Sequence, residues 1–455
     1  MHSAIPFGLA LAALTLAAPQ HPITLPSSPL LYKFNVSSEH RNEFIDIAHS
    51  HDLDIWSTSS TVDIYSSNIP DALAGYPYTT SQPPQSLHTT QASIGGPWNL
   101  SSLTNSTFHQ SYHPLYEIDQ FIHQLASEYP HLVNVVHLGH SAEGREMLAL
   151  RISSTSNTTS SAHTQKKHKH KGKDKPKEDP PKLSILLLGA QHAREWVASA
   201  TSLYLAHSII SSSAEQHSLS SLLTTYDFYI IPIPNPDGYV YTWESDRFWY
   251  KNRQVLRPDA GSNECRGLDM NRNWGYKWKK RGGPDGVRGD AVEGDECTHS
   301  YPGHRPFESP EVNNIANYMS TIPNLVAFLN LRAYGQMVST PFSYSCKRYP
   351  PDSEDLFEAS LGAISALRSI HATEFTTGRL CETLYAAGGN VADWVYKRVV
   401  GAWKGRVKYV YAVHLRDTGT YGFALPAQWI RPVGEETAAL VRYLAGFVGG
   451  QMGRV

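Results

Sequence analysis

The segment Gln191–Trp196, which reads Gln-His-Ala-Arg-Glu-Trp, constrains this chain more than any other. It follows the apolar run Leu183–Gly189, which is typical of a buried strand, and precedes a helix-like stretch, Val197–Ala206. His192 and Glu195 therefore fall at the strand-to-helix edge where open α/β sheets bind ligands. A His and a Glu at this spacing can share a divalent metal ion such as zinc, which requires one more protein ligand. Alone, the pattern also fits an ordinary helix N-terminus with an acid in its first turn.

Strands and helices alternate along most of the chain, which predicts an α/β fold with a mixed central β-sheet flanked by helices. The expected strands include Tyr226–Ile233, Leu325–Leu331 and Lys408–His414, and the expected helices include Ser353–Ala372 and Gly434–Val448. The predicted organisation is a signal peptide at 1–18, a small α+β segment at 19–70, a linker at 71–108 and a main domain at 109–455.

The stretch 153–182 is rich in Ser, Thr, Lys and His, and we expect it to be a disordered surface insertion. Its Lys and His residues would suit metal ions or acidic polysaccharide, but a solvated loop is the favoured interpretation. The net charge of −2 with neutral histidines argues against a nucleic-acid partner.

The N-terminus predicts export. The apolar run Ala4–Ala18 ends in small residues and resembles a secretory signal, and no later run is apolar enough to span a membrane. We therefore expect a secreted, extracellular protein, with the vacuole as the alternative destination. Four sequons for N-glycosylation agree with export, at Asn35, Asn99, Asn105 and Asn157.

The chain has four cysteines, an even number that predicts two disulfides in an oxidising compartment. Four cysteines allow three connectivities. Proximity in the sequence favours Cys265–Cys297 and Cys346–Cys381.

Four motifs together resemble those of the zinc carboxypeptidases of the carboxypeptidase A type. They are His192–Trp196, Asn235–Gly238, Asp269–Trp274 and Leu415–Phe423, in the order found in that family. The resemblance extends from about Tyr112 to the C-terminus, and the segment 19–70 resembles a reduced pro-segment. It also includes the spacing of Cys265 and Cys297, which matches a disulfide of the family.

This resemblance implies one zinc site, with His192 and Glu195 as ligands and Asp269 orienting a ligand histidine. It implies that Asn271 and Arg272 clamp the carboxylate of a substrate, a task that suits the bidentate geometry of arginine. An apolar pocket floor at Ala392 implies apolar C-terminal side chains. The substrate-binding residues expected in full are Arg194, Arg247, Asn271, Arg272, Tyr334, Tyr385 and Ala392.

Three positions depart from the pattern of the family. The third zinc ligand should be a histidine, but the matching residue is Arg332, whose guanidinium has no lone pair for a metal. The glutamate that acts as general base is replaced by His414, and the arginine that stabilises the oxyanion is replaced by Tyr250. Loss of one oxyanion donor typically costs about 10²–10³ in rate.

Because the losses affect hydrolysis and spare the carboxylate clamp, the favoured interpretation is a secreted, inactive carboxypeptidase-like protein. It is similar to the fungal proteins of this family that are linked to cell-wall organisation. Its expected partner is a peptide or protein C-terminus or another acidic ligand, with zinc weak or sub-stoichiometric. One alternative is an active zinc carboxypeptidase that removes apolar C-terminal residues, with His414 as third ligand and Arg332 at the oxyanion. Another is a structural remnant that binds nothing. A few extra residues near Val399–Arg406 are either a real loop or a gene-model error.

Overall fold

The computed structural model describes residues 28–58, 61–83, 96–154, 180–256, 265–279, 295–397 and 407–454. Four predictions fall outside these ranges wholly or largely: the signal peptide at 1–18, the insertion 153–182, the sequon at Asn157 and the extra residues near 399–406.

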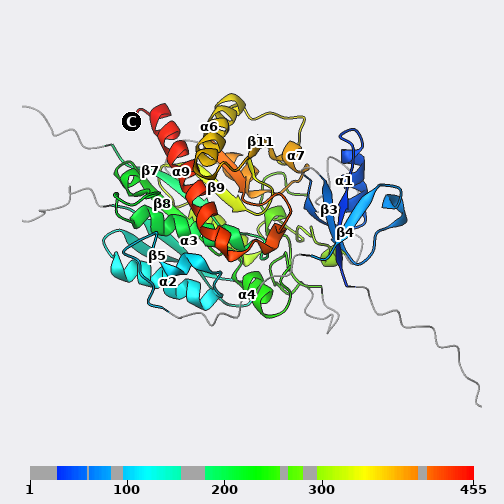
Figure 1. Cartoon of the computed structure of the whole chain (residues 1–455), viewed down its shortest axis with the longest axis horizontal. Coiled ribbons are helices and arrows are strands. Elements are labelled where there is room, and N and C mark those ends of the chain that lie inside the picture. The colour runs from blue at the N-terminus through cyan, green and yellow to red at the C-terminus, as the bar shows by residue number, and fades with distance from the viewer. Residues whose placement is uncertain are drawn as a thin grey trace, which may run out of the picture.

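An eight-stranded mixed sheet forms the centre of the main domain, in the strand order β11-β10-β12-β9-β7-β8-β6-β5 (Figure 1). The inner strands β8, β7, β9 and β12 are parallel to one another, and every residue in them is buried. This explains their continuous apolar sequences. The strands are β5 (Val133–His140), β6 (Glu146–Ile152), β7 (Leu183–Leu188), β8 (Tyr226–Ile231), β9 (Leu325–Arg332), β10 (Met337–Thr340), β11 (Thr376–Arg379) and β12 (Tyr409–His414).

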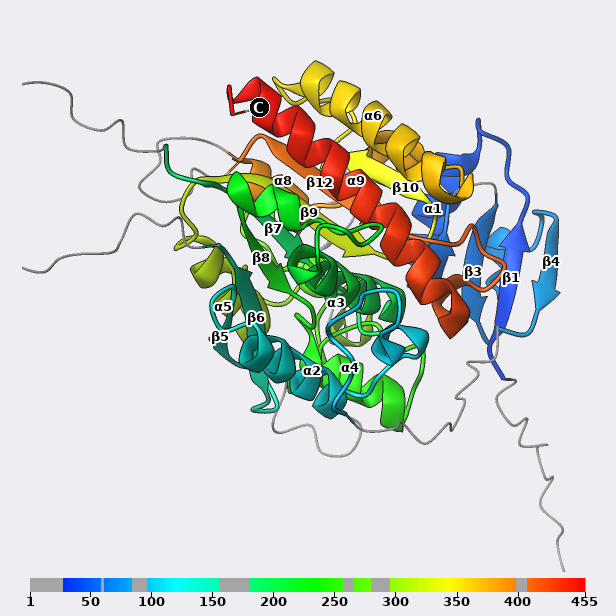
Figure 2. The ribbon, with the colours of Figure 1, turned by 60° about the vertical axis from the view of Figure 1, so that its left-hand side comes forward.

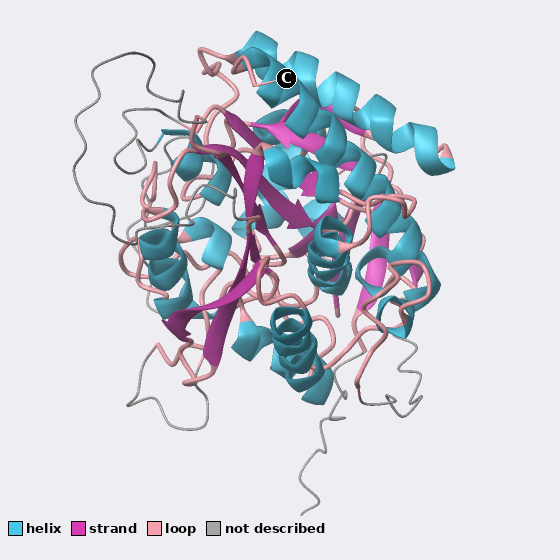
Figure 3. Ribbon diagram, turned by 90° about the vertical axis from the view of Figure 1, so that its left-hand side faces the viewer, coloured by secondary structure: helices cyan, strands magenta, loops and turns pink. Residues whose placement is uncertain are grey.

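Helices cover both faces of this sheet (Figure 3), which confirms the predicted fold class. The two longest described helices, α6 and α9, lie side by side (Figure 2). Helix α3 has no separate polar face because it is buried almost completely. The helices are α2 (Leu115–Glu128), α3 (Trp196–Ile210), α4 (Pro236–Glu244), α5 (Pro310–Met319), α6 (Ser353–His371), α7 (Leu380–Thr383), α8 (Val391–Lys397) and α9 (Ile430–Gln451). None of the helices in the described ranges is both long and apolar enough to cross a membrane.

A small front domain packs against one end of the main domain (Figure 1). It has an antiparallel sheet in the order β2-β3-β1-β4 and one helix. Its own core includes Phe34, Phe44 and Ile64. The elements are β1 (Leu30–Phe34), α1 (Arg41–Ser50), β2 (Asp54–Ser57), β3 (Val62–Ser66) and β4 (Tyr78–Ser81).

The predicted linker at 71–108 needs correction. Strand β4 lies within it, and its four residues are all exposed, so no apolar alternation marks it as a strand. Trp98, Leu100 and Leu103 are buried, and the first two join the core of the main domain. These isolated apolar residues stand in a Ser- and Asn-rich stretch, which is why the sequence suggested a linker.

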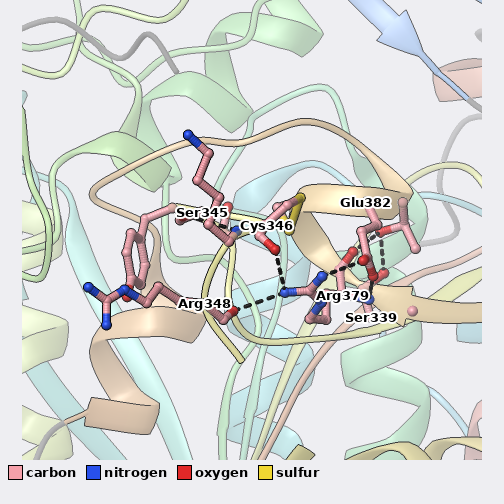
Figure 4. Close-up of a disulfide and its surroundings, with 12 residues drawn as sticks. Ser339, Ser345, Cys346, Arg348, Arg379 and Glu382 are labelled. Atoms are coloured by element: carbon pink, nitrogen blue, oxygen red, sulfur yellow. Dashed lines mark hydrogen bonds and ion pairs between the residues drawn. A yellow bond between two sulfur atoms is a disulfide. The ribbon is translucent and has the colours of Figure 1, made fainter. Parts of the chain in front are cut away.

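Both predicted disulfides are present, Cys265–Cys297 and Cys346–Cys381. The second lies beside Arg379, which donates to the backbone carbonyls of Cys346 and Arg348 at 3.0 and 2.9 Å (Figure 4). The disulfide and the guanidinium together fix this loop against α7.

Candidate active site

The buried parallel strands bring the predicted metal-site residues together. The segment that follows β7 holds His192 and Glu195, β9 ends at Arg332 and β12 ends at His414. Arg332 and His414 are direct partners in the parallel β9–β12 ladder. Because parallel strands end at one edge of the sheet, residues from distant parts of the sequence share this site.

The guanidinium of Arg332 occupies the side of His192 and Glu195 that would face a metal ion. Its Nε lies 2.9 Å from Oε2 of Glu195, and its Nη2 lies 2.9 Å from Oε1. Nη2 also lies 2.5 Å from Nδ1 of His192. Since a guanidinium only donates, Nδ1 accepts, and Nε2–H of His192 donates to Asp269 Oδ1 at 2.8 Å. All four side chains are buried.

The charges of this network balance. Burial opposes ionisation of Glu195, but the charge and hydrogen bonds of Arg332 outweigh it and lower the pKa of Glu195 to about 2. Burial likewise opposes ionisation of Asp269, and His192 and Arg272 lower its pKa to about 2. Two carboxylates thus face two guanidinium groups, Arg332 and Arg272, in a buried setting where an unpaired charge would be costly.

The two other substituted positions hold a buried histidine and a stacked tyrosine. His414 is 3% exposed, and burial and the charge of Arg332 lower its pKa to about 3, so it is neutral at physiological pH. The ring of Tyr250 stacks on His192, with centroids 3.7 Å apart, and the guanidinium of Arg194 lies 4.7 Å from its centre. Neither side chain supplies the carboxylate or the cation that it replaces.

The expected carboxylate clamp is assembled in part. Arg272 Nη2 donates to the hydroxyl of Tyr385 at 3.1 Å, and Nη1 donates to the backbone carbonyl of Asn271 at 3.2 Å. The side-chain oxygen of Asn271 accepts from the backbone N–H of Val391 at 3.1 Å. Arg272 and Tyr385 therefore come together as expected, while the oxygen of the Asn271 amide is engaged internally.

Four other predicted residues take part in packing. Arg247 stacks 3.8 Å from the ring centre of Trp196 and donates to the carbonyls of Arg194 and Phe423 at 2.9 and 2.6 Å. These contacts tie the segment before α3 to the loop that holds Phe423. Tyr334 is buried against Phe423, and Ala392 is fully buried in α8. Arg194 is paired with the front domain.

Sequence reasoning missed that pairing. Asp54 of β2 accepts from Arg194 Nη1 at 2.6 Å and from Nη2 at 2.8 Å. Burial raises the pKa of Asp54, but Arg194 outweighs it, so that the pKa lies below its usual value. Around this pair, Trp56 packs on Phe248 and Phe423. The only signal in the sequence was acidic–apolar alternation across residues 52–56, which does not identify a partner.

The residues of the site do not fit a zinc ion. Zinc needs three protein ligands and an open position, whereas Arg332 places a cation in contact with both residues able to bind the metal. Within the described ranges, no group of three or more His, Cys, Asp or Glu side chains is arranged to hold a metal ion.

The sequence matches a known protein family and several of its members. Residues 118–440 match the family model described as zinc carboxypeptidase. The inactive metallocarboxypeptidase ecm14 of Sclerotinia sclerotiorum is 33% identical over 368 residues, which cover 77% of this chain and 56% of the relative. The protein of the same name from Ajellomyces dermatitidis is 34% identical over 374 residues, covering 78% and 57%. The chain thus spans little more than half the length of these relatives.

Solved structures agree on the fold. A structure of thrombin-activatable fibrinolysis inhibitor is 26% identical with a TM-score of 0.70, covering 92% of this chain and 98% of that one. The carboxypeptidase A of Helicoverpa armigera is 23% identical with a TM-score of 0.73, covering 94% and 98%, and shows the shared fold alone.

Proposed function

The chain belongs to the zinc carboxypeptidase family, and from this premise we propose that it is a non-hydrolytic member that binds carboxylates. The observation that carries the proposal is the guanidinium of Arg332, which pairs with Glu195 and contacts His192 where the family holds its metal. The names of the fungal relatives, which call them inactive metallocarboxypeptidases, support it.

Hydrolysis by this family's chemistry needs a metal to activate water, a base to accept its proton and a cation at the developing oxyanion. Arg332 opposes the first because it brings a positive charge and no lone pair. His414 is neutral and carries no negative charge to offset a metal. Tyr250 presents a phenol where the cation belongs.

Binding has better support than cleavage. Arg272 is buried beside Tyr385, and its charge and planar donors suit a carboxylate. The ligand we propose is therefore a peptide or protein C-terminus or a smaller acid. We further propose that the protein is exported and has a role in cell-wall organisation. Export is supported by the signal-like N-terminus and by the exposed sequons at Asn35, Asn99 and Asn105.

A carboxypeptidase assay on the purified chain tests the proposal. The substrate is an N-acylated dipeptide with a C-terminal phenylalanine, supplied with zinc. The wild-type chain should show no turnover. The triple variant Arg332→His, His414→Glu, Tyr250→Arg should bind zinc and gain activity, since it restores the missing ligand, base and cation.

The front domain covers part of the cleft in both proteins, and this cover could itself prevent turnover. Zinc content is therefore measured on the same samples, so that loss of the metal site is seen separately from loss of access. Wild-type turnover with a full zinc complement would overturn the proposal. If that turnover were lost in His414→Ala, it would instead establish the alternative in which His414 swings in as the third ligand.

A further inference from the structure

A cavity lies between the front domain and the main domain. It is partly open to solvent. Arg272 and Tyr385 line it on the side of the main domain, and His49, Asp52 and Asp54 line it on the side of the front domain. Both domains are therefore needed to form this cavity.

The wall contributed by the main domain offers an anion-binding group. Arg272 is 5% exposed, and its nearest carboxylate, Oδ2 of Asp269, lies 3.7 Å from Nη1. Its Nε is buried and has no hydrogen-bond partner among the described residues. The guanidinium thus retains donor capacity that the protein itself does not use.

The front domain offers a carboxylate. Asp52 accepts from the backbone N–H of His299 at 2.9 and 3.3 Å. Across the described part of the chain, no Lys, Arg or His side chain lies within ion-pair distance of Asp52, whereas Asp54 is fully engaged by Arg194. Burial raises the pKa of Asp52 despite His299, as expected for a carboxyl that lacks a close cation.

The rest of the lining adds little free charge. Burial and the nearby Arg272 lower the pKa of His49 to about 4, so this imidazole is neutral at physiological pH. Its ring packs against Tyr385, with centroids 4.5 Å apart. Leu53 and Ile55 add apolar surface to the same wall. Arg194 and Asp269 also line the cavity, but Arg194 is paired with Asp54, and Asp269 accepts from His192 and lies near Arg272. The cavity therefore has an arginine with one unpartnered donor, a carboxylate without an ion-pair partner among the described residues, and an apolar side.

We propose that this two-domain cavity binds a small zwitterion of the free α-amino-acid class. Its carboxylate lies against Arg272 and Tyr385, and its ammonium group faces Asp52. The inference rests on the proposed function, because it requires that Arg272 still binds carboxylates. It goes further in assigning the front domain half of the binding site.

A zwitterion matches the two charged walls of this cavity better than a peptide does. The nitrogen of a C-terminal peptide residue is a neutral amide, which gives Asp52 no counter-charge. A peptide must also continue along the cleft, where Asp54 already occupies Arg194. A free amino acid does not continue along the cleft, and it carries a charge for each wall.

Isothermal titration calorimetry on the intact chain tests this with three ligands of one shape. They are L-leucine, 4-methylpentanoate, which lacks the ammonium group, and isoamylamine, which lacks the carboxylate. Leucine should bind at least about tenfold more tightly than either analogue, since a charge-assisted contact is worth about that much. Asp52→Asn should abolish the preference over 4-methylpentanoate.

Arg272→Gln should weaken leucine binding by about tenfold or more. Because it also removes a counter-ion from Asp269, its folding is checked by thermal unfolding. Tyr385→Phe removes only a hydroxyl and should weaken binding several-fold in a chain that still folds. The exposed substitutions Asp71→Asn and Arg368→Gln should leave the affinity unchanged.

Absence of leucine binding, or binding that survives Arg272→Gln, would overturn the inference. Equal affinity for leucine and 4-methylpentanoate would overturn the role of Asp52. Neither result touches the proposed loss of hydrolysis, which zinc content and turnover decide separately.

Discussion

Arg332 does at this site what a metal ion does in an active relative: it holds two side chains in place. Its planar guanidinium donates to both oxygens of Glu195 and to His192. A metal could be removed from such a site, but a side chain cannot. The substitution therefore converts a site that can be loaded and emptied into a permanent part of the core.

Replacing Arg332 with methionine should be strongly destabilising. It would leave Glu195 ionised and buried without its cation, and breaking a buried pair in this way costs about 3–5 kcal/mol. Urea denaturation measures the loss. Arg368→Met is the matched control, because its pair with Glu374 is exposed and should cost about 1 kcal/mol or less. Equal losses in the two variants would contradict the account.

His414 should make the protein less stable as the pH falls. Its pKa is about 3 in the folded chain and near 6.5 when unfolded, so between these values the unfolded state binds the additional proton. The free energy of unfolding then decreases on acidification, by up to about 1.4 kcal/mol per pH unit for one group. Denaturation between pH 6.5 and 5 stays above the range in which Glu195 changes stability, because its pKa is 4.5 in the unfolded chain and about 2 in the folded one.

Within that window His414→Gln should show a shallower dependence on pH than the wild-type chain. His123→Gln is an exposed control and should keep the wild-type slope. If both variants gave the same slope as the wild type, His414 would not be the buried neutral group described here.

At the scale of elements, β2 is the part of the front domain that reaches the cleft. Asp54, its first residue, pairs with Arg194 from the segment before α3, and Trp56 packs on the main domain two residues later. One side of a short strand thus supplies both the charge and the apolar contact. The front domain consequently forms one side of the site.

A double-mutant cycle with Asp54→Asn and Arg194→Gln should measure this docking. Each single change leaves a buried charge without its partner, so we expect a coupling above about 1.5 kcal/mol in the free energy of unfolding. The exposed pair Arg368 and Glu374 provides the reference cycle, with a coupling of about 1 kcal/mol or less. Coupling no larger than the reference would mean that the two domains are not held by this pair.

Strands in which every residue is buried could be predicted from the sequence, because their residues are mostly apolar. The apolar runs of β7, β9 and β12 predicted strands of a mixed sheet. The structure shows that these strands are parallel, and this brings Glu195, Arg332 and His414 to one edge. The pairing of Cys346 with Cys381 followed from proximity in the sequence. In these cases local pattern and topology were sufficient.

What could not be predicted depended on contacts between elements. Strand β4 has no buried residue, so no pattern marks it. From the sequence, Arg194 and Arg247 were expected to bind substrate. In the structure, Arg194 donates to Asp54, and Arg247 donates to two backbone carbonyls. Only the docked arrangement of two sheets shows where such side chains are used.

At the scale of the whole molecule, the front and main domains form one cleft with a balanced charge network behind it. Arg332 and Arg272 lie on either side of the two carboxylates Glu195 and Asp269, and neither guanidinium depends on a metal. The fold of the zinc carboxypeptidase family here holds a cavity that opens between the two domains.

The stoichiometry of zinc tests the central claim most directly. The intact chain and Arg332→His are each equilibrated with zinc, freed of loosely bound metal and analysed by plasma mass spectrometry. The account predicts well below one equivalent for the wild type and an approach to one equivalent for Arg332→His, which completes a set of two histidines and a glutamate. One tightly held equivalent in the wild-type chain that disappears in His192→Ala would contradict it.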